Sequence, residues 1–215
     1  MIKNLIFDVD GTIWDNTEIV AGAWTEVAKL TGFRDGIITA EELKGEFGKP
    51  MYEIIHNLFP GVQSESDLAR TNDLVNEIED RFLRECSMDL TYTGIVDTIR
   101  ELAGEFAIFI VSNCQDGYIE LMLEKTGLLG YVRDFTCFGV TGLPKSGSIM
   151  KLMDRNQLEG EETVYIGDTQ GDYDATKEAG LKFIFAGYGF GHVETPDAVF
   201  YKSSELKNAV LSCGK

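Results

Sequence analysis

An apolar run near the start of the chain ends in two aspartates that stand one residue apart. Residues 2–7 predict a short buried strand, and the sequence Asp8-Val9-Asp10-Gly11-Thr12 follows directly. Two like charges this close repel each other, and burying them costs free energy unless something neutralises them. The sequence therefore predicts a metal ion, a shared proton or a bound substrate beside Asp8 and Asp10.

The rest of the chain falls into two patterns. Residues 16–86 show helical periodicity and no convincing strand, with helices expected after Asn16, from Thr39 and over 51–59 and 64–84. After Gly94, helices expected over 95–102, 115–126, 146–157 and 173–178 alternate with strands expected at 106–111, 135–140, 163–166 and 181–186. Such alternation is typical of a parallel α/β sheet. We therefore expect a Rossmann-like parallel sheet core over residues 1–14 and 89–215, with an all-helical domain inserted at 15–88.

The amino-acid composition limits the binding partners and the cellular compartment that fit this chain. The 215 residues carry a formal charge of −17, which argues against nucleic acid and against an anionic membrane surface. We find no signal peptide, no apolar stretch long enough to span a bilayer and no C-x-x-C pair among the four cysteines. The sequence thus predicts a cytoplasmic protein with free thiols, and it leaves the oligomeric state open.

Further polar residues follow the other expected strands. Ser112 and Asn113 follow the strand at 106–111, Lys145 lies in the expected loop after Val140, and Asp168 and Asp172 follow the strand at 163–166. Ligands of open parallel sheets bind beyond the carboxyl ends of the strands. We therefore expect these residues to share one edge of the sheet with Asp8 and Asp10.

Each of these groups suits a step of phosphoryl transfer. Asp8 can act as a nucleophile, and Asp10 can act as a general acid and base on the same side of an extended backbone. A set of oxygen ligands from Asp8, Asp10 and Asp168, without nearby His or Cys, suits Mg²⁺. Asp172 lies one helical turn after Asp168 and can hold the metal directly or through water.

The phosphate itself needs hydrogen-bond donors and a positive charge. Ser112 and the backbone N–H groups of Asn113 and Gly11 can donate to phosphate oxygens, and Lys145 can supply the charge that the transferring group needs. Thr12 either binds phosphate through its backbone or merely closes the turn.

These motifs resemble those of the haloacid dehalogenase superfamily. The resemblance covers essentially the whole chain and is closest to the phosphoglycolate-phosphatase-like branch, through Tyr165-Ile-Gly-Asp-Thr169 and Tyr188-Gly-Phe-Gly191. It implies a phosphatase that acts on a small phosphorylated metabolite, with the helical insertion as a cap domain. Dehalogenases of the superfamily carry no acidic residue at the position that matches Asp10. The presence of Asp10 therefore argues against halide chemistry.

The same resemblance implies a role for each site residue. Asp8 would attack phosphorus, and Asp10 would protonate the leaving alkoxide and then activate the hydrolytic water. The carboxylates of Asp8 and Asp168 and the main-chain carbonyl of Asp10 would hold Mg²⁺.

Other interpretations stay open for single motifs. The aspartates can form a capped turn, Ser112-Asn113 can cap the next helix, and Lys145 can be a solvated loop lysine. Lys49, in the helical insertion, can touch a second anionic group of the substrate or simply face solvent. Trp14 and Trp24 are expected to be packing residues, and the glycines at 187, 189 and 191 predict a loop at the rim of the site rather than a dinucleotide motif.

Two other functions fit the same residues. A phosphomutase similar to β-phosphoglucomutase would return the phosphoryl group to a sugar instead of water. A non-catalytic phosphate-binding protein would keep the fold without turnover, although intact Asp8, Asp10 and Asp168 argue against it.

Overall fold

The computed structural model describes residues 1–214, and the chain forms two compact units. A sheet unit comprises residues 1–15 and the chain from Thr91 onward, and a helical unit comprises residues 16–90. The helical unit follows the first strand of the sheet directly in the sequence. Its role as a cap domain, with the boundaries given above, stays a prediction.

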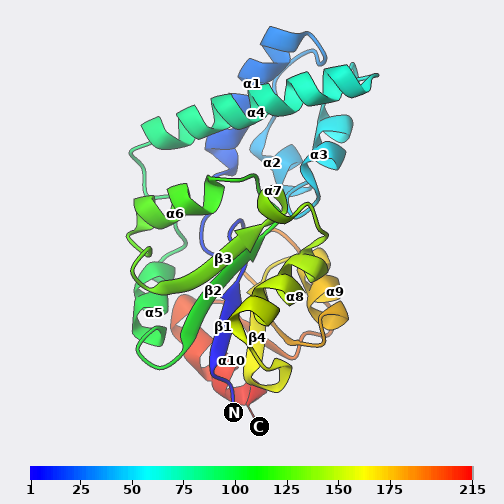
Figure 1. Cartoon of the computed structure of the whole chain (residues 1–215). Coiled ribbons are helices and arrows are strands. Elements are labelled where there is room, and N and C mark those ends of the chain that lie inside the picture. Colours follow the sequence, from blue (N-terminus) through cyan, green and yellow to red (C-terminus); the bar gives the residue numbers. More distant parts are fainter. Residues whose placement is uncertain (215) are drawn as a thin grey trace. The chain divides into compact units, whose positions relative to one another are not determined.

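The sheet unit is built on six parallel strands in the order β3-β2-β1-β4-β5-β6 (Figure 1). Their bounds are β1 Asn4–Phe7, β2 Ala107–Ser112, β3 Val132–Cys137, β4 Thr163–Gly167, β5 Lys182–Ala186 and β6 Ala198–Phe200. The register places Phe7 of β1 level with Ile110 on one side and Ile166 on the other. The predicted parallel α/β sheet is confirmed, and the chain crosses from one side of β1 to the other after β3.

Helices pack on this sheet through apolar side chains. Their bounds are α5 Ile95–Leu102, α6 Tyr118–Thr126, α7 Phe138–Thr141, α8 Lys145–Asn156, α9 Gln170–Glu178 and α10 Leu206–Cys213, with single 3₁₀ turns at Gly160–Glu162 and Ser203–Glu205. Ile149 of α8 and Ala175 of α9 join a buried cluster with Phe109 and Phe183 of the strands. This core fixes the first turns of α8 and α9, which carry Lys145 and Asp172.

The helical unit contains α1 Thr17–Thr31, α2 Ala40–Lys44, α3 Met51–Leu58 and α4 Glu65–Glu85. Helices α1 and α4 pack on each other (Figure 1). The buried Trp24 of α1 donates from Nε1 to Oε2 of Glu79 on α4 at 2.7 Å. The predicted capping box is confirmed, because Thr39 and Glu42 exchange both capping bonds. Asn16 stands at the N-cap of α1 but its side chain makes no capping bond.

Three sequence predictions at the ends of elements are wrong. Residues 138–140, expected in a strand, belong to the short helix α7, because β3 pairs with β2 only as far as Cys137. Residues 115–117 precede α6, which begins after Gly117 at a φ of 85°. Lys145 is the first residue of α8 and does not lie in a loop. Sequence patterns also missed β6 and α10.

Within residues 1–214, the helices are all too short or too polar to cross a lipid bilayer. The four cysteines are free thiols, as predicted.

Candidate active site

The carboxyl ends of β1, β2 and β4 gather most of the predicted site residues. Asp8 follows β1 and donates its backbone N–H to Ile166 of β4 at 2.9 Å. Asp168 follows β4, and Ser112 is the last residue of β2. Because β1 lies between β2 and β4, these residues meet where the strand order changes direction, which is where open α/β sheets bind ligands.

Three buried carboxylates form a cluster at this edge. One oxygen each from Asp8, Asp168 and Asp172 lies within 4.8 Å of the others, and the three residues are at most 2% exposed. Burial raises the pKa of Asp8 to about 7, despite the opposing effect of Lys145. Burial, together with the charges of Asp172 and Asp8, also raises the pKa of Asp168 well above its usual range. The raised pKa values indicate that the surroundings do not fully neutralise Asp8 and Asp168 when both are ionised, so their oxygens suit a divalent cation.

Lys145 is the positive charge within this cluster. Its Nζ lies 3.2 Å from Oδ1 of Asp8 and donates a hydrogen bond to Oδ1 of Asp172, and the residue is only 6% exposed. Burial alone would lower the pKa of Lys145, but the carboxylates of Asp172 and Asp8 raise it well above its ordinary value. The side chain is therefore a buried ammonium group, and the interpretation as a solvated loop lysine is wrong.

Asp172 uses both carboxylate oxygens within the protein. Oδ1 accepts from Lys145, and Oδ2 accepts from the backbone N–H of Thr169 at 3.0 Å, from the Thr169 hydroxyl at 2.7 Å and from the backbone N–H of Asp168 at 3.2 Å. These bonds include the capping box of α9. The geometry makes Asp172 an anchor of Lys145 and of the Asp168 loop.

The loop after β5 completes the environment of Asp168. The backbone N–H of Phe190 donates to Oδ2 of Asp168 at 2.7 Å, and the Thr12 hydroxyl donates to Oδ1 at 3.4 Å. A Cβ on Gly189 would lie 2.3 Å from Cβ of Asp168. This loop leads into β6 and not into a helix, so the prediction of a rim loop is confirmed and a dinucleotide motif does not form.

Gly11 allows the turn after β1 to lie close to the side chain of Asp168. Its φ is 78°, and a Cβ at this position would lie 2.0 Å from Oδ2 of Asp168. Only a glycine tolerates both conditions. The tyrosine hydroxyl of Tyr188 also donates to the Thr12 carbonyl at 2.7 Å, which ties the rim loop to the same turn.

Ser112 and Asn113 stand one strand away from Asp8. The register sets Phe7 opposite Ile110, so Asp8 is level with Val111 and Ser112 comes one residue later. Ser112 is buried and Asn113 is half-buried. The interpretation that this pair caps the following helix is wrong, because Gly117 occupies the N-cap of α6.

Two side chains that sequence reasoning did not assign to the site contact Asp10. The Tyr118 hydroxyl donates to its Oδ1 at 2.6 Å, and Nε1 of Trp14 donates to the same oxygen at 3.0 Å. Trp14 is buried, as expected of a packing residue, but it also has this polar contact. Nothing in the local sequence pattern marked Tyr118, which comes from the first turn of α6.

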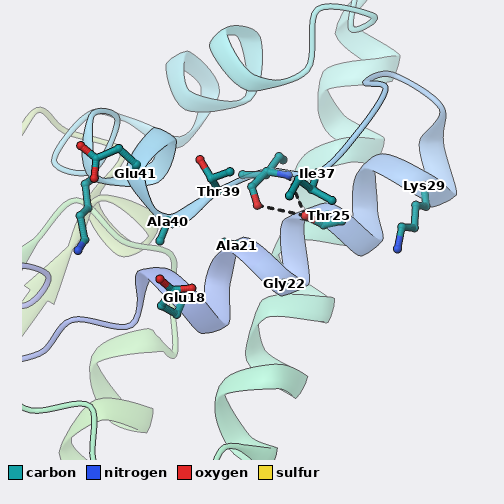
Figure 2. A pocket seen from close by; sticks show the side chains of 11 residues that line it. Glu18, Ala21, Gly22, Thr25, Lys29, Ile37, Thr39, Ala40 and Glu41 are labelled. Atoms are coloured by element: carbon teal, nitrogen blue, oxygen red, sulfur yellow. Dashed lines mark hydrogen bonds between the residues drawn. The ribbon is translucent and has the colours of Figure 1, made fainter.

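Lys49 belongs to the helical unit, where its Nζ pairs with Oε2 of Glu46 at 2.8 Å. The same unit has a surface hollow of about 650 Å³ between α1 and the segment 37–41 (Figure 2). Its lining includes Lys29, Thr39 and Glu41 but none of the predicted site residues. The Thr25 hydroxyl, which lines it, accepts from the backbone N–H of Ile38 at 2.9 Å.

Comparison with known proteins identifies the family of this chain. A family model described as haloacid dehalogenase-like hydrolase matches residues 5–186, which span β1 to β5 and all the predicted site residues. The chain belongs to the haloacid dehalogenase-like hydrolase family. Membership confirms the predicted resemblance and identifies the protein as an enzyme.

Relatives of this hydrolase match it along nearly its full length. Phosphoglycolate phosphatase of Vibrio parahaemolyticus is 27% identical over 97% of this chain and 96% of its own length. Phosphoglycolate phosphatase of Pseudomonas fluorescens is 22% identical over 97% of this chain and 79% of its own.

Solved structures show the same fold for this hydrolase. A haloacid dehalogenase-like family hydrolase from Streptococcus pneumoniae superposes with a TM-score of 0.83 at 20% identity, covering 96% of this chain and 97% of that one. A "predicted phosphatase" from Clostridium acetobutylicum superposes with a TM-score of 0.84 at 18% identity, covering 98% of this chain and 99% of that one.

Proposed function

We propose that this hydrolase is a Mg²⁺-dependent phosphatase that cleaves a small phosphomonoester through an aspartyl-phosphate on Asp8. The observation that carries the proposal is the buried cluster in which Lys145 touches both Asp8 and Asp172 while Asp168 lies beside them. Named phosphoglycolate phosphatases match the chain over nearly its whole length, so phosphoglycolate is the first substrate to test.

Asp8 is the nucleophile in this proposal. A carboxylate oxygen of Asp8 forms a bond to phosphorus while the bond from phosphorus to the ester oxygen breaks, and Asp10 gives its proton to the departing alkoxide. Water then attacks the same phosphorus, Asp10 takes its proton, and the bond from phosphorus to Asp8 breaks. The second step returns both aspartates to their starting state and releases phosphate.

The three-carboxylate cluster is where the cation would bind. The carboxylates of Asp8 and Asp168 and the main-chain carbonyl of Asp10 would hold Mg²⁺, and Asp172 would reach it through water. Oδ1 of Asp8 is buried and makes no hydrogen bond among the described residues, although Nζ of Lys145 lies 3.2 Å away in an ion pair, so this oxygen can still act as a metal ligand. When bound, Mg²⁺ would offset the repulsion between these carboxylates and the phosphate.

Hydrogen-bond donors at the carboxyl ends of the strands would hold most of the phosphoryl oxygens. Ser112 and the backbone N–H of Asn113 are suited to this role, and Lys145 adds a positive charge. The backbone N–H groups of Gly11 and Thr12, also expected to bind phosphate, instead donate within the turn to the carbonyls of Trp14 at 2.9 Å and of Val9 at 3.2 Å. The strongly acidic chain, at −17, needs the local cation of Lys145 to attract an anion.

The helical unit would act as the cap domain that selects the substrate, with Lys49 as a candidate contact to a second anionic group. A small soluble metabolite in the cytoplasm is the expected partner, and neither nucleic acid nor membrane is expected to bind.

Phosphate release from a panel of small phosphomonoesters tests the proposal. The panel contains phosphoglycolate and several sugar phosphates, each assayed with Mg²⁺ and with EDTA, for the wild type and for Asp8→Asn. We expect metal-dependent release from at least one compound and complete loss in the variant. Full activity of Asp8→Asn would overturn the nucleophile assignment, and isomerised sugar phosphate after priming with a bisphosphate would identify a phosphomutase instead.

A further inference from the structure

One oxygen of the Asp10 carboxylate accepts two hydrogen bonds from aromatic side chains. Oδ1 lies 2.6 Å from the Tyr118 hydroxyl and 3.0 Å from Nε1 of Trp14. Both distances are those of ordinary hydrogen bonds. A carboxylate oxygen has two lone pairs, so these two donors use the acceptor capacity of Oδ1 in full.

The two donors are themselves held firmly. Trp14 is 1% exposed and Tyr118 is 5% exposed, and their rings pack edge to face with centroids 5.6 Å apart. Trp14 closes a tight turn in which Gly11 donates its backbone N–H to the Trp14 carbonyl at 2.9 Å. Tyr118 is the first residue of α6, directly after the positive φ of Gly117. Two separate segments of the sheet unit therefore fix the same carboxylate.

We propose that Trp14 and Tyr118 are positioning residues that hold Oδ1 of Asp10 and so make Oδ2 the oxygen that exchanges a proton with the leaving group. This inference rests on the proposed function, because it assumes that Asp10 acts as the general acid. A carboxylate with its rotamer fixed needs no reorientation at the moment of transfer. In this proposal the two donors act through Asp10 and do not touch the substrate.

Leaving-group dependence separates positioning from simple packing. An alkyl phosphate has a poor leaving group that needs a proton from Asp10, whereas p-nitrophenyl phosphate releases a stable phenolate that needs little help. The parameter kcat/KM reports the steps up to departure of this group. A defect in the orientation of Asp10 therefore lowers kcat/KM for the alkyl ester selectively, whereas a packing defect lowers both values alike.

The principal test is Tyr118→Phe, which removes the hydroxyl and keeps the ring against Trp14. For an alkyl phosphomonoester that the wild type hydrolyses, we expect kcat/KM to fall by about tenfold to a hundredfold. For p-nitrophenyl phosphate we expect a change of less than about twofold. Asp10→Asn should show the same discrimination to a greater degree. Equal losses for both esters, or no loss for either, would overturn the inference.

Two more variants complete the design. Tyr131→Phe removes a hydroxyl from an exposed tyrosine that stacks near Arg100, and it should leave both values unchanged. Trp14→Phe removes the second donor, so a selective loss is expected there too, even if Tyr118→Phe does not fold. In the double variant, the losses should be less than multiplicative, since both residues act through Asp10.

Failure of the proposed function and failure of the positioning role give different experimental results. A wild type that releases no phosphate from any ester would overturn the proposed function together with this inference. An active wild type whose Trp14 and Tyr118 variants show no selective loss would overturn only the positioning role.

Discussion

Nζ of Lys145 lies 3.2 Å from Oδ1 of Asp8, and both residues are almost completely buried. The same ammonium group donates to Oδ1 of Asp172, so one cation joins the end of β1 to the first turn of α9. Since Lys145 itself begins α8, three elements meet at a single charge. Lys145 is therefore expected to contribute both to the folding stability of this edge of the sheet and to catalysis.

Lys145→Met should therefore impair both properties. Without the ammonium group, two buried carboxylates lose their partner, and a loss of about 3–5 kcal/mol in the free energy of unfolding is expected at neutral pH. Phosphatase activity should fall at least about a hundredfold, because the phosphoryl group loses its fixed positive charge. Chemical denaturation and steady-state kinetics measure the two effects. Lys151→Met, at an exposed position on the same helix, should change neither, and equal behaviour of the two variants would contradict the role of Lys145.

Gly189→Ala should weaken the binding of the metal. The added methyl group would lie 2.3 Å from Cβ of Asp168 and 2.5 Å from the Gly11 carbonyl, so Asp168 has to move. We expect the Mg²⁺ concentration for half-maximal activity to rise about tenfold or more, since metal ligands tolerate little displacement. Gly130→Ala is the control, because a Cβ there meets no atom within 4 Å. An unchanged Mg²⁺ requirement in Gly189→Ala would refute the close packing of the rim loop on Asp168.

The metal-free protein should lose stability as the pH rises. Burial raises the pKa of Asp8 from its ordinary value of 3.8 to about 7 in the folded state. The folded protein therefore keeps a proton that the unfolded chain releases, so this stabilisation is complete below about pH 4 and is lost as the pH rises through about 7.

The variant Asp8→Asn isolates this effect, because its amide does not titrate. In EDTA, its free energy of unfolding relative to the wild type should increase between pH 4 and pH 8. Urea denaturation at several pH values measures the difference. A difference that stays constant over this range would show that Asp8 is not the titrating group.

Mg²⁺ should stabilise the folded wild type directly. A ligand that binds only the folded state at a hundred times its Kd adds about 2.7 kcal/mol to the free energy of unfolding. Thermal unfolding at pH 7.5 should thus show a higher Tm with Mg²⁺ than with EDTA, and Asp168→Asn should reduce this shift strongly. Asp174→Asn is a suitable control, because Asp174 is exposed on α9, where its Oδ1 accepts a hydrogen bond from Gln170 at 2.8 Å. An identical shift in both variants would place the cation elsewhere.

Much of the sheet edge could be predicted because its residues follow strongly apolar strands. Asp8 and Asp168 stand directly after β1 and β4, whose residues are all buried, so a parallel sheet had to bring them together. The expected grouping of Asp8, Asp168 and Lys145 is what the structure shows, although their roles in catalysis stay predictions. Lys145 was expected in a loop, whereas a helix begins there directly after Pro144.

The rest of the site depends on contacts across long separations in sequence. Tyr118 reaches Asp10 over 108 residues, and Phe190 reaches Asp168 over 22 residues through a backbone N–H that no side-chain pattern reveals. Strand β6 has only three residues, of which Val199 is exposed, so its apolar signal is weak. Residues of helix α7 were predicted as strand because Phe138 and Val140 extend the apolar run that begins at Phe135.

Trapping the phosphorylated enzyme tests the central claim most directly. Asp10→Asn lacks the base for the second step, so rapid acid quench after mixing with p-nitrophenyl phosphate and Mg²⁺ should capture a covalent phosphoryl group. Mass spectrometry of the peptides should place it on Asp8, and the double variant with Asp8→Asn should carry none. Release of p-nitrophenol by wild-type enzyme without a phosphoryl group on Asp8 in any quenched sample, or with one on another residue, would contradict the account.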